Sequence, residues 1–190
     1  MAGGDSVKKK AVWQNRIFSQ VKPMFYMLLI LLLAFAGWYL YPGQKLPPDA
    51  IIDRLLVLKS QRKMIAFHGE DQVKTYHIAL GGSPAGHKQF EGDRKTPEGI
   101  YTINDRNPNS AYHKNLGVSY PNDADKLFAS KLGKSPGGDI KIHGLPNGRG
   151  NIGKLHRLKD WTLGCIAVTD EEIDELYRAV IPDAIIEIRP

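Results

Sequence analysis

The chain has 190 residues, which is enough for one domain of ordinary size and a short appendage. Its apolar content of 42% supports a packed core, and 19 glycines with 12 prolines favour a strand-rich and loop-rich domain over a helical bundle. The formal net charge is +6, but residues 1–22 carry five basic side chains against one acidic, so +4 of that charge lies there. A basic tail beside an apolar run is a membrane-topology signal, and it argues against a nucleic-acid partner.

An uncharged apolar run of 18 residues, 24–41, follows the basic tail directly. As a helix it would span about 27 Å, close to the thickness of a hydrocarbon core. Aromatic residues cluster at both of its ends, and Pro23 and Pro42 bracket it. We therefore expect a single-pass anchor with the tail in the cytoplasm and the rest exported. The Ala-Phe-Ala segment at 34–36 leaves a cleavable signal peptide as the alternative, and both alternatives export the domain.

The rest of the chain divides into a linker and a domain. Residues 42–50 are proline-rich and predict a short, stiff linker, whereas short apolar alternations from residue 51 onward predict successive strands. A capping box opened by Thr169 predicts a helix that Pro182 ends. The predicted strands are residues 55–59, 64–67, 73–80, 100–103, 115–120, 139–143 and 184–188, with a weaker helix at 123–132. This pattern indicates a β-dominated α+β domain, either a sandwich or a partly open barrel.

Two long polar loops interrupt this pattern, at residues 81–99 and 144–153. Loops of such length are uncommon in compact domains and are usually functional. Arg94, Lys95 and Arg149 lie in them and are candidates to bind substrate carboxylates, with solvated loop charge as the alternative.

The single cysteine, Cys165, cannot form an internal disulfide in an exported domain. It directly follows Gly164, and His143 ends an apolar strand just before Gly144. A thiol nucleophile needs a nearby base or cation, and an adjacent glycine lets substrate approach the backbone. Considered without further context, a buried structural cysteine and a hydrogen-bonding histidine explain the same residues.

Several separated stretches resemble the L,D-transpeptidase catalytic (YkuD-type) family. Residues 142–144 (Ile-His-Gly) and 161–165 (Trp-Thr-Leu-Gly-Cys) are similar to the family signature of a histidine, a loop and then Ser/Thr-His-Gly-Cys. Further matching stretches lie in the same order at residues 78–87, 91–99, 119–121 and 136–144. The resemblance runs from about residue 51 to the C-terminus and implies a β-sandwich-like catalytic domain without a metal or an organic cofactor.

The resemblance also implies an acyl-transfer reaction on peptidoglycan stem peptides. Cys165 would attack the amide that joins the third residue of a stem tetrapeptide to the terminal D-alanine. His143 would act as its base and then as the acid toward the departing amine. An amine acceptor would resolve the thioester, whereas resolution by water would make the enzyme a hydrolase.

Other residues of the two signature stretches would support this pair. The resemblance implies that the Gly144 carbonyl orients the histidine ring. It also implies that the N–H groups of Leu163, Gly164 and Cys165 face the oxyanion. Thr162 would either donate to the site or hold the turn, and Trp161 would either pack or contact substrate.

Two departures from the family pattern concern the acceptor. Leu163 occupies a position where many members carry a second histidine, and the 18-residue loop between His143 and Thr162 is slightly longer than usual. Both features are similar to a compact subgroup that includes enzymes acting on murein–lipoprotein linkages. A hydrolase of such linkages is therefore the second candidate function, with murein lipoprotein as a second partner.

Two other classes of protein are weaker alternatives. A zinc peptidase is disfavoured because the sequence has neither H-x-H nor H-E-x-x-H. A non-catalytic wall-binding module would keep the fold without needing the cysteine and histidine. We expect a bacterial inner-membrane protein with its catalytic domain in the periplasm. The predicted segments are a cytoplasmic tail (1–22), a transmembrane anchor (23–41), a linker (42–50) and the catalytic domain (51–190).

Overall fold

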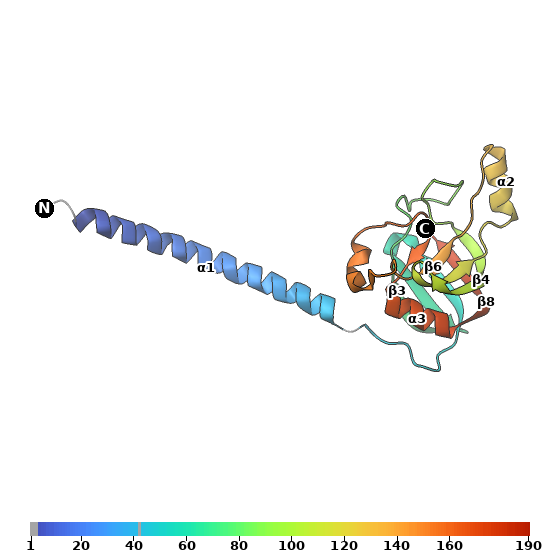
Figure 1. Ribbon diagram of the computed structural model, residues 1–190, viewed down its shortest axis with the longest axis horizontal. Coiled ribbons are helices and arrows are strands. Elements are labelled where there is room, and N and C mark those ends of the chain that lie inside the picture. The colour runs from blue at the N-terminus through green and yellow to red at the C-terminus, as the bar shows by residue number, and fades with distance from the viewer. Residues whose placement is uncertain (1–3, 42) are drawn as a thin grey trace. The chain divides into compact units, whose positions relative to one another are not determined.

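The computed structural model describes residues 4–41 and 43–190. Residues 1–3 and Pro42, with its predicted role as a boundary of the apolar run, lie outside this description. The chain divides after Gly43 into two compact units. The first contains a single helix, α1 (Gly4–Leu40), and the second, from Gln44 to Pro190, contains eight strands and the shorter helices (Figure 1).

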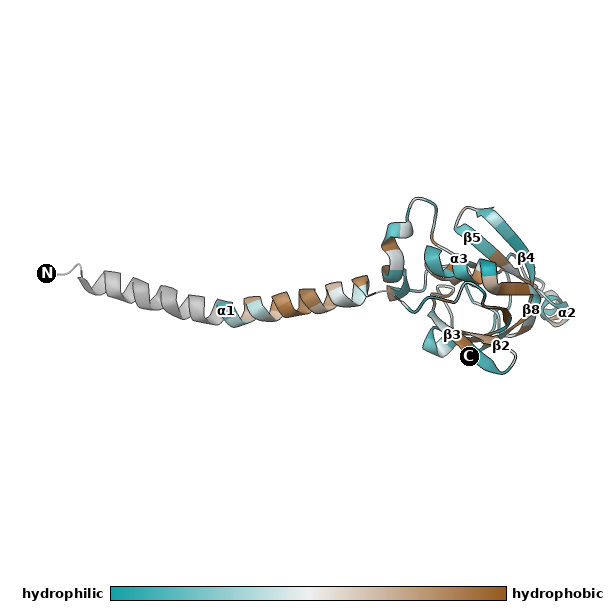
Figure 2. Cartoon of the chain, turned by 90° about the horizontal axis from the view of Figure 1, so that it is seen from below, coloured by the Kyte–Doolittle hydropathy of each residue, from teal (hydrophilic) through white to brown (hydrophobic). Residues whose placement is uncertain are grey.

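The helix α1 continues through Pro23, so the apolar run after this proline is the C-terminal part of a longer helix. A proline removes one backbone hydrogen bond and favours a kink, but a helix with enough residues on both sides can continue past it. Figure 2 shows mainly apolar residues along the coloured, C-terminal part of α1. The stretch Lys22–Leu40 is long and apolar enough to cross a membrane, and a signal sequence near an N-terminus meets the same criteria.

The second unit is built around one strongly bent mixed sheet with the strand order β3-β2-β1-β8-β4-β5-β6-β7. The strand β4 joins its two halves, because residues 99–102 pair with β8 and later residues pair with β5. The strands are β1 (Ile52–Leu58), β2 (Lys63–His68), β3 (Asp71–His77), β4 (Gly99–Ser110), β5 (His113–Val118), β6 (Lys141–His143), β7 (Ile166–Ala167) and β8 (Val180–Arg189).

The two edges of this sheet meet, which makes the domain a partly closed barrel. Ala79, two residues after β3, exchanges backbone hydrogen bonds of 3.0 and 2.8 Å with Ala167 of β7. Side chains from both halves of the sheet fill the interior, among them the fully buried Leu55, Tyr76 and Ile142. The predicted β-dominated α+β fold class is thereby confirmed.

Two α-helices and two 3₁₀ segments accompany the sheet. These are α2 (Asp123–Lys131), α3 (Asp170–Ala179), η1 (Lys59–Gln61) and η2 (Gly150–Leu158). The helix α3 packs on the sheet with Ile173 and Leu176 fully buried, whereas α2 projects from the domain (Figure 1). The Thr169 capping box starts α3 as predicted.

The end of α3 differs from the prediction. The helix stops at Ala179, and β8 begins at Val180 and includes Pro182. The pairing of β8 with β1 is irregular between Val180 and Ile185, so the proline lies where no regular ladder needs its missing N–H.

The start of the domain lies inside the stretch that the sequence predicts as a linker. Leu46 is only 5% exposed and belongs to the hydrophobic core. Its N–H donates to Glu175 Oε1 at 3.0 Å, which attaches this segment to α3.

Candidate active site

The turn that carries Cys165 is held by a hydroxyl group. Thr162 Oγ1 accepts the Gly164 N–H at 3.1 Å and donates to the Cys165 carbonyl at 2.8 Å. Gly164 has φ +139°, and a Cβ there would lie 2.7 Å from the Lys95 carbonyl oxygen. Only glycine fits this position, because both the backbone angle and the space exclude a side chain.

The segment that enters this turn is anchored by Asp160. Its carboxylate accepts two N–H groups of Arg62, at 2.7 and 3.0 Å from Oδ2, and the Leu80 N–H at 2.9 Å. The Thr162 N–H donates to the Leu80 carbonyl at 3.1 Å. Ion pairing and backbone pairing together therefore fix the chain before it reaches Cys165.

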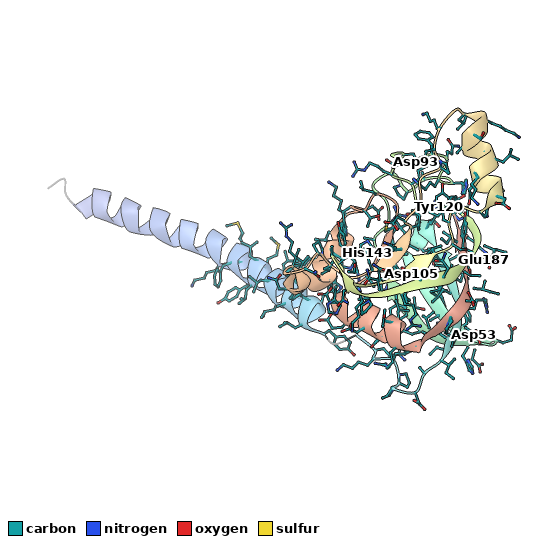
Figure 3. All side chains as sticks on the ribbon, turned by 45° about the vertical axis from the view of Figure 1, so that its right-hand side comes forward. Asp53, Asp93, Asp105, Tyr120, His143 and Glu187 are labelled. Atoms are coloured by element: carbon teal, nitrogen blue, oxygen red, sulfur yellow. The ribbon has the colours of Figure 1, made fainter. Side chains whose placement is uncertain are left out.

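His143, labelled in Figure 3, is the last residue of β6, and its ring is oriented by its own neighbour, Gly144. Its Nδ1 lies 2.7 Å from the Gly144 carbonyl oxygen, which can only accept, so Nδ1 carries the proton and Nε2 is the basic nitrogen. The Tyr112 and Trp161 rings lie 4.6 and 5.7 Å from the imidazole, between centroids. Two aromatic rings and a carbonyl therefore fix this base.

Parallel pairing of β6 and β7 brings the thiol and the imidazole to neighbouring strands. Ile142 pairs with Ile166 and His143 with Ala167, and Cys165 directly precedes this ladder. The Cys165 Sγ donates to the Asp139 carbonyl, just before β6, at 3.5 Å.

Burial shifts both groups toward their neutral forms. Burial lowers the pKa of His143, against the raising effect of its bond to Gly144, and the charge of Lys141 lowers it further. Burial raises the pKa of the Cys165 thiol, and the Lys141 backbone N–H and ammonium oppose that rise. The resting pair is consequently a thiol beside a neutral imidazole, which suits a base-assisted nucleophile.

One wall of the site is the 81–98 loop, which is organised by two buried lysines. Lys59 Nζ donates to the Gly86 and Thr96 carbonyls at 2.7 and 2.9 Å and to Glu98 at 2.8 Å. Lys88 donates to Asp93 at 2.8 Å, whose carboxylate also accepts backbone N–H groups of the same loop. These bonds hold the Lys95 carbonyl against Gly164.

The other wall is formed by residues 144–161. Asp170, at the start of α3, accepts the Leu145 N–H at 2.8 Å, and Arg157 pairs with Glu172 at 2.5 Å. Within residues 4–41 and 43–190, His156 Nδ1 and Nε2 and Trp161 Nε1 are buried without a hydrogen-bond partner. His156 lies close enough to His143 for the two to interact electrostatically, and burial lowers its pKa to about 4.

The sequence-predicted substrate residues fall into two groups. Arg94 and Lys95 lie beside the Cys165 turn, since their backbone atoms contact Gly81 and Gly164, and Trp161 lies beside His143. Arg149 is exposed at the start of η2, and the structure gives its side chain no contact with the Cys165–His143 pair. Leu163 is 76% exposed next to the nucleophile.

The Gly164 N–H differs from its predicted role. Because it donates to Thr162 Oγ1, it is engaged within the turn and not directed at an oxyanion. The sequence analysis also missed Lys141, Tyr112 and Asp170. For Lys141 a signal was present, because it alternates with His143 along one strand, whereas Tyr112 and Asp170 reach the site only through tertiary packing.

A search of known families matches the YkuD L,D-transpeptidase catalytic domain over residues 52–188. The chain belongs to this family. Within the described residues, no group of three or more His, Cys, Asp or Glu side chains is arranged to hold a metal ion.

Similar members of the L,D-transpeptidase family include YafK of Escherichia coli K12, 30% identical over 110 residues that make up 57% of this chain and 37% of YafK. The chain therefore spans well under half of that relative. Among solved structures, Pgp2 of Campylobacter jejuni, described as a helical cell shape determining protein, superposes with a TM-score of 0.56 at 26% identity, over 74% of this chain and 48% of Pgp2. The structure of Bdellovibrio bacteriovorus Bd1075 superposes with a TM-score of 0.50 at 28% identity, over 75% of this chain and 49% of Bd1075.

Proposed function

We propose that this protein is a cysteine L,D-transpeptidase that uses Cys165 as nucleophile and His143 as base on peptidoglycan stem tetrapeptides. The observation that carries the proposal is the arrangement of the pair. The imidazole lies on β6 and the thiol directly precedes β7, the strand that pairs with β6 in parallel, and the Gly144 carbonyl leaves His143 Nε2 as the basic nitrogen.

The reaction proceeds through a thioester. His143 Nε2 takes the thiol proton as Sγ attacks the carbonyl carbon before D-alanine. The tetrahedral adduct collapses when its C–N bond breaks, and the imidazolium gives its proton to the departing amine. An acceptor amine then attacks the thioester carbon and passes a proton to His143, and the released thiolate recovers that proton.

The Cys165 turn supplies the electrostatic support for this step. With Gly164 engaged by Thr162, the Leu163 and Cys165 N–H groups are the ones assigned to the oxyanion. Thr162 keeps the turn in shape and does not touch substrate. Trp161 Nε1, Arg94 and Lys95 are assigned to substrate binding from their places beside the pair.

A hydrolase of the same linkage is the second candidate. The apolar, 76% exposed Leu163 stands beside the nucleophile where many members of the family have a second histidine. A site that lacks this histidine can differ in how it binds an acceptor amine, in which case water resolves the thioester.

We further assign the protein to the bacterial inner membrane, with residues 23–41 as its span, the tail 1–22 in the cytoplasm and the domain from residue 51 in the periplasm. The apolar stretch Lys22–Leu40 and the basic residues before it support this orientation. We also propose a role in cell shape, because Pgp2 is described as a helical cell shape determining protein. Murein lipoprotein would be either the acceptor of the acyl group or the partner whose linkage is cleaved.

The test is product analysis with the full chain in detergent and a disaccharide tetrapeptide. Release of D-alanine with a new crosslinked product identifies a transpeptidase, and release with tripeptide alone identifies a hydrolase. Cys165→Ala must abolish either product. If the tetrapeptide stays unchanged with every acceptor and lipoprotein-linked murein is not cleaved, the remaining hypothesis is a non-catalytic wall-binding module.

A further inference from the structure

The strand β6 places a third functional side chain beside the candidate pair. Continuing the β6–β7 register by one residue sets Lys141 opposite Cys165, and Lys141 and His143 are two residues apart on one strand. Opposed residues and residues at i and i+2 project from the same face of a sheet. The side chains of Lys141, His143 and Cys165 therefore share one face.

The charges around this face leave Lys141 as a partly compensated cation. Its Nζ lies 3.0 Å from Asp139 Oδ1, but the Asp139 side chain is 86% exposed whereas that of Lys141 is 27% exposed. Solvent screens the carboxylate far more than the ammonium. Lys88, the other cation that acts on the thiol, is buried in its pair with Asp93.

We propose that Lys141 is a positioning residue that stabilises the Cys165 thiolate and keeps His143 in its neutral, basic form. It acts through these two residues and is not itself a catalytic group. The inference rests on the proposed function only in taking Cys165 as nucleophile and His143 as base. The placement of Lys141 on their face is independent of any substrate.

The directions of the pKa shifts agree with this placement. The Lys141 charge and backbone N–H lower the pKa of Cys165, and the charge lowers the pKa of His143. Asp139 acts oppositely on the thiol, and His156 and Tyr112 are further titratable side chains beside His143. Because the Lys141 charge lowers the pKa of Cys165 and the pKa of His143, removing it must raise both pKa values, whichever of the two residues loses its proton first.

The experiment measures the pH midpoint of Cys165 alkylation by iodoacetamide in the full chain, which needs no peptide substrate. Lys141→Met should raise the midpoint by roughly 0.5–1 unit, at the low end for a neighbouring charge because Asp139 offsets it. Lys141→Arg should restore it. Asp139→Asn should lower the midpoint, and asparagine tolerates the φ of 61° at this position. Lys126→Met, on α2, should change nothing.

An unchanged midpoint in Lys141→Met, or an equal rise in Lys141→Arg, would overturn the inference. If Lys141→Met does not fold, Lys141→Gln, which keeps a polar side chain but no charge, replaces it with the same expected rise in the midpoint, and an unchanged midpoint in Lys141→Gln would equally overturn the inference. In the same variants, the pH midpoint of the acid limb of kcat/KM should move upward together with the alkylation midpoint. A shifted midpoint without any acyl transfer would support the role of Lys141 and contradict the transpeptidase proposal. Acyl transfer with an unshifted midpoint would support the transpeptidase proposal and contradict the role of Lys141.

Discussion

The two walls of the Cys165–His143 site differ in how completely their buried polar atoms are paired. At the 81–98 loop, Lys59 and Lys88 are 2% and 4% exposed. The Lys59 ammonium donates to two carbonyls and a carboxylate, and the Lys88 ammonium to one carbonyl and a carboxylate. In the segment that follows His143, His156 and Trp161 hold buried nitrogens without partners among residues 4–41 and 43–190.

We propose that this difference separates a rigid scaffold from a surface that binds substrate. A fully bonded buried network rigidifies the backbone around it, whereas an unpaired buried donor or acceptor costs roughly 1–3 kcal/mol and is retained where a function uses it. The loop therefore fixes the nucleophile turn through the Lys95 carbonyl. The His156–Trp161 segment keeps hydrogen-bonding capacity next to the base.

Loss of the Lys59 ammonium should break the scaffold wall with the largest effect. Lys59→Met leaves two backbone carbonyls and Glu98 without their donor, so we expect a loss of about 3–5 kcal/mol in the free energy of unfolding. Chemical denaturation measures it. Lys126→Met removes an exposed pair on α2 and should cost less than about 0.5 kcal/mol. Equal costs for the two variants would refute the scaffold role.

Removal of the Thr162 hydroxyl should loosen the turn that this wall supports. Thr162→Val keeps the shape but deletes two hydrogen bonds, and we expect a loss of about 2 kcal/mol with acylation of Cys165 slowed roughly 10- to 100-fold. Thr162→Ser keeps the hydroxyl and should stay near wild type. The comparison fails if the valine and serine variants acylate equally fast.

The unpaired wall should be sensitive to acid. His156 in the unfolded chain takes up a proton near pH 6.5, but in the folded protein only near pH 4. Stability is therefore unaffected above this window and falls as the pH drops through it, by about 1–2 kcal/mol between pH 7 and 5. Urea titrations should show that the free energy of unfolding of His156→Gln falls by about 1–2 kcal/mol less than that of the wild type over the same pH range. Asn109→Ala, at an exposed position without a titratable group, should keep the wild-type slope.

Trp161→Phe gives the smallest and most selective change. It keeps an aromatic ring beside His143 but removes the unpaired Nε1–H together with part of the indole ring. Relief of the unpaired donor and loss of packing oppose each other, so the free energy of unfolding should change by less than about 1 kcal/mol. If Nε1 binds substrate, KM for the tetrapeptide should rise about fivefold with kcat nearly unchanged. An unaltered KM would make Trp161 a packing residue.

The sequence was informative where local patterns decide structure. Alternation and turn residues predicted most strands, and the Thr169 capping box placed the start of α3 correctly. It failed where tertiary pairing overrides a local signal, as at Pro182, which lies inside an irregular part of β8 and does not end α3. Cys165 and His143 were candidates from their glycine neighbours. The buried roles of Lys59, His156 and Asp170 depend on contacts with residues far away along the chain, which no local pattern encodes.

The central claim is that Cys165 forms a thioester with the stem peptide, and intact-protein mass spectrometry of the full chain with disaccharide tetrapeptide tests it most directly. We predict an adduct equal in mass to the donor without D-alanine, located on Cys165, absent in Cys165→Ala and formed far more slowly in His143→Ala. Two results would contradict the proposal. One is an adduct that still forms in Cys165→Ala, and the other is product that accumulates in Cys165→Ala as fast as in the wild type without any adduct.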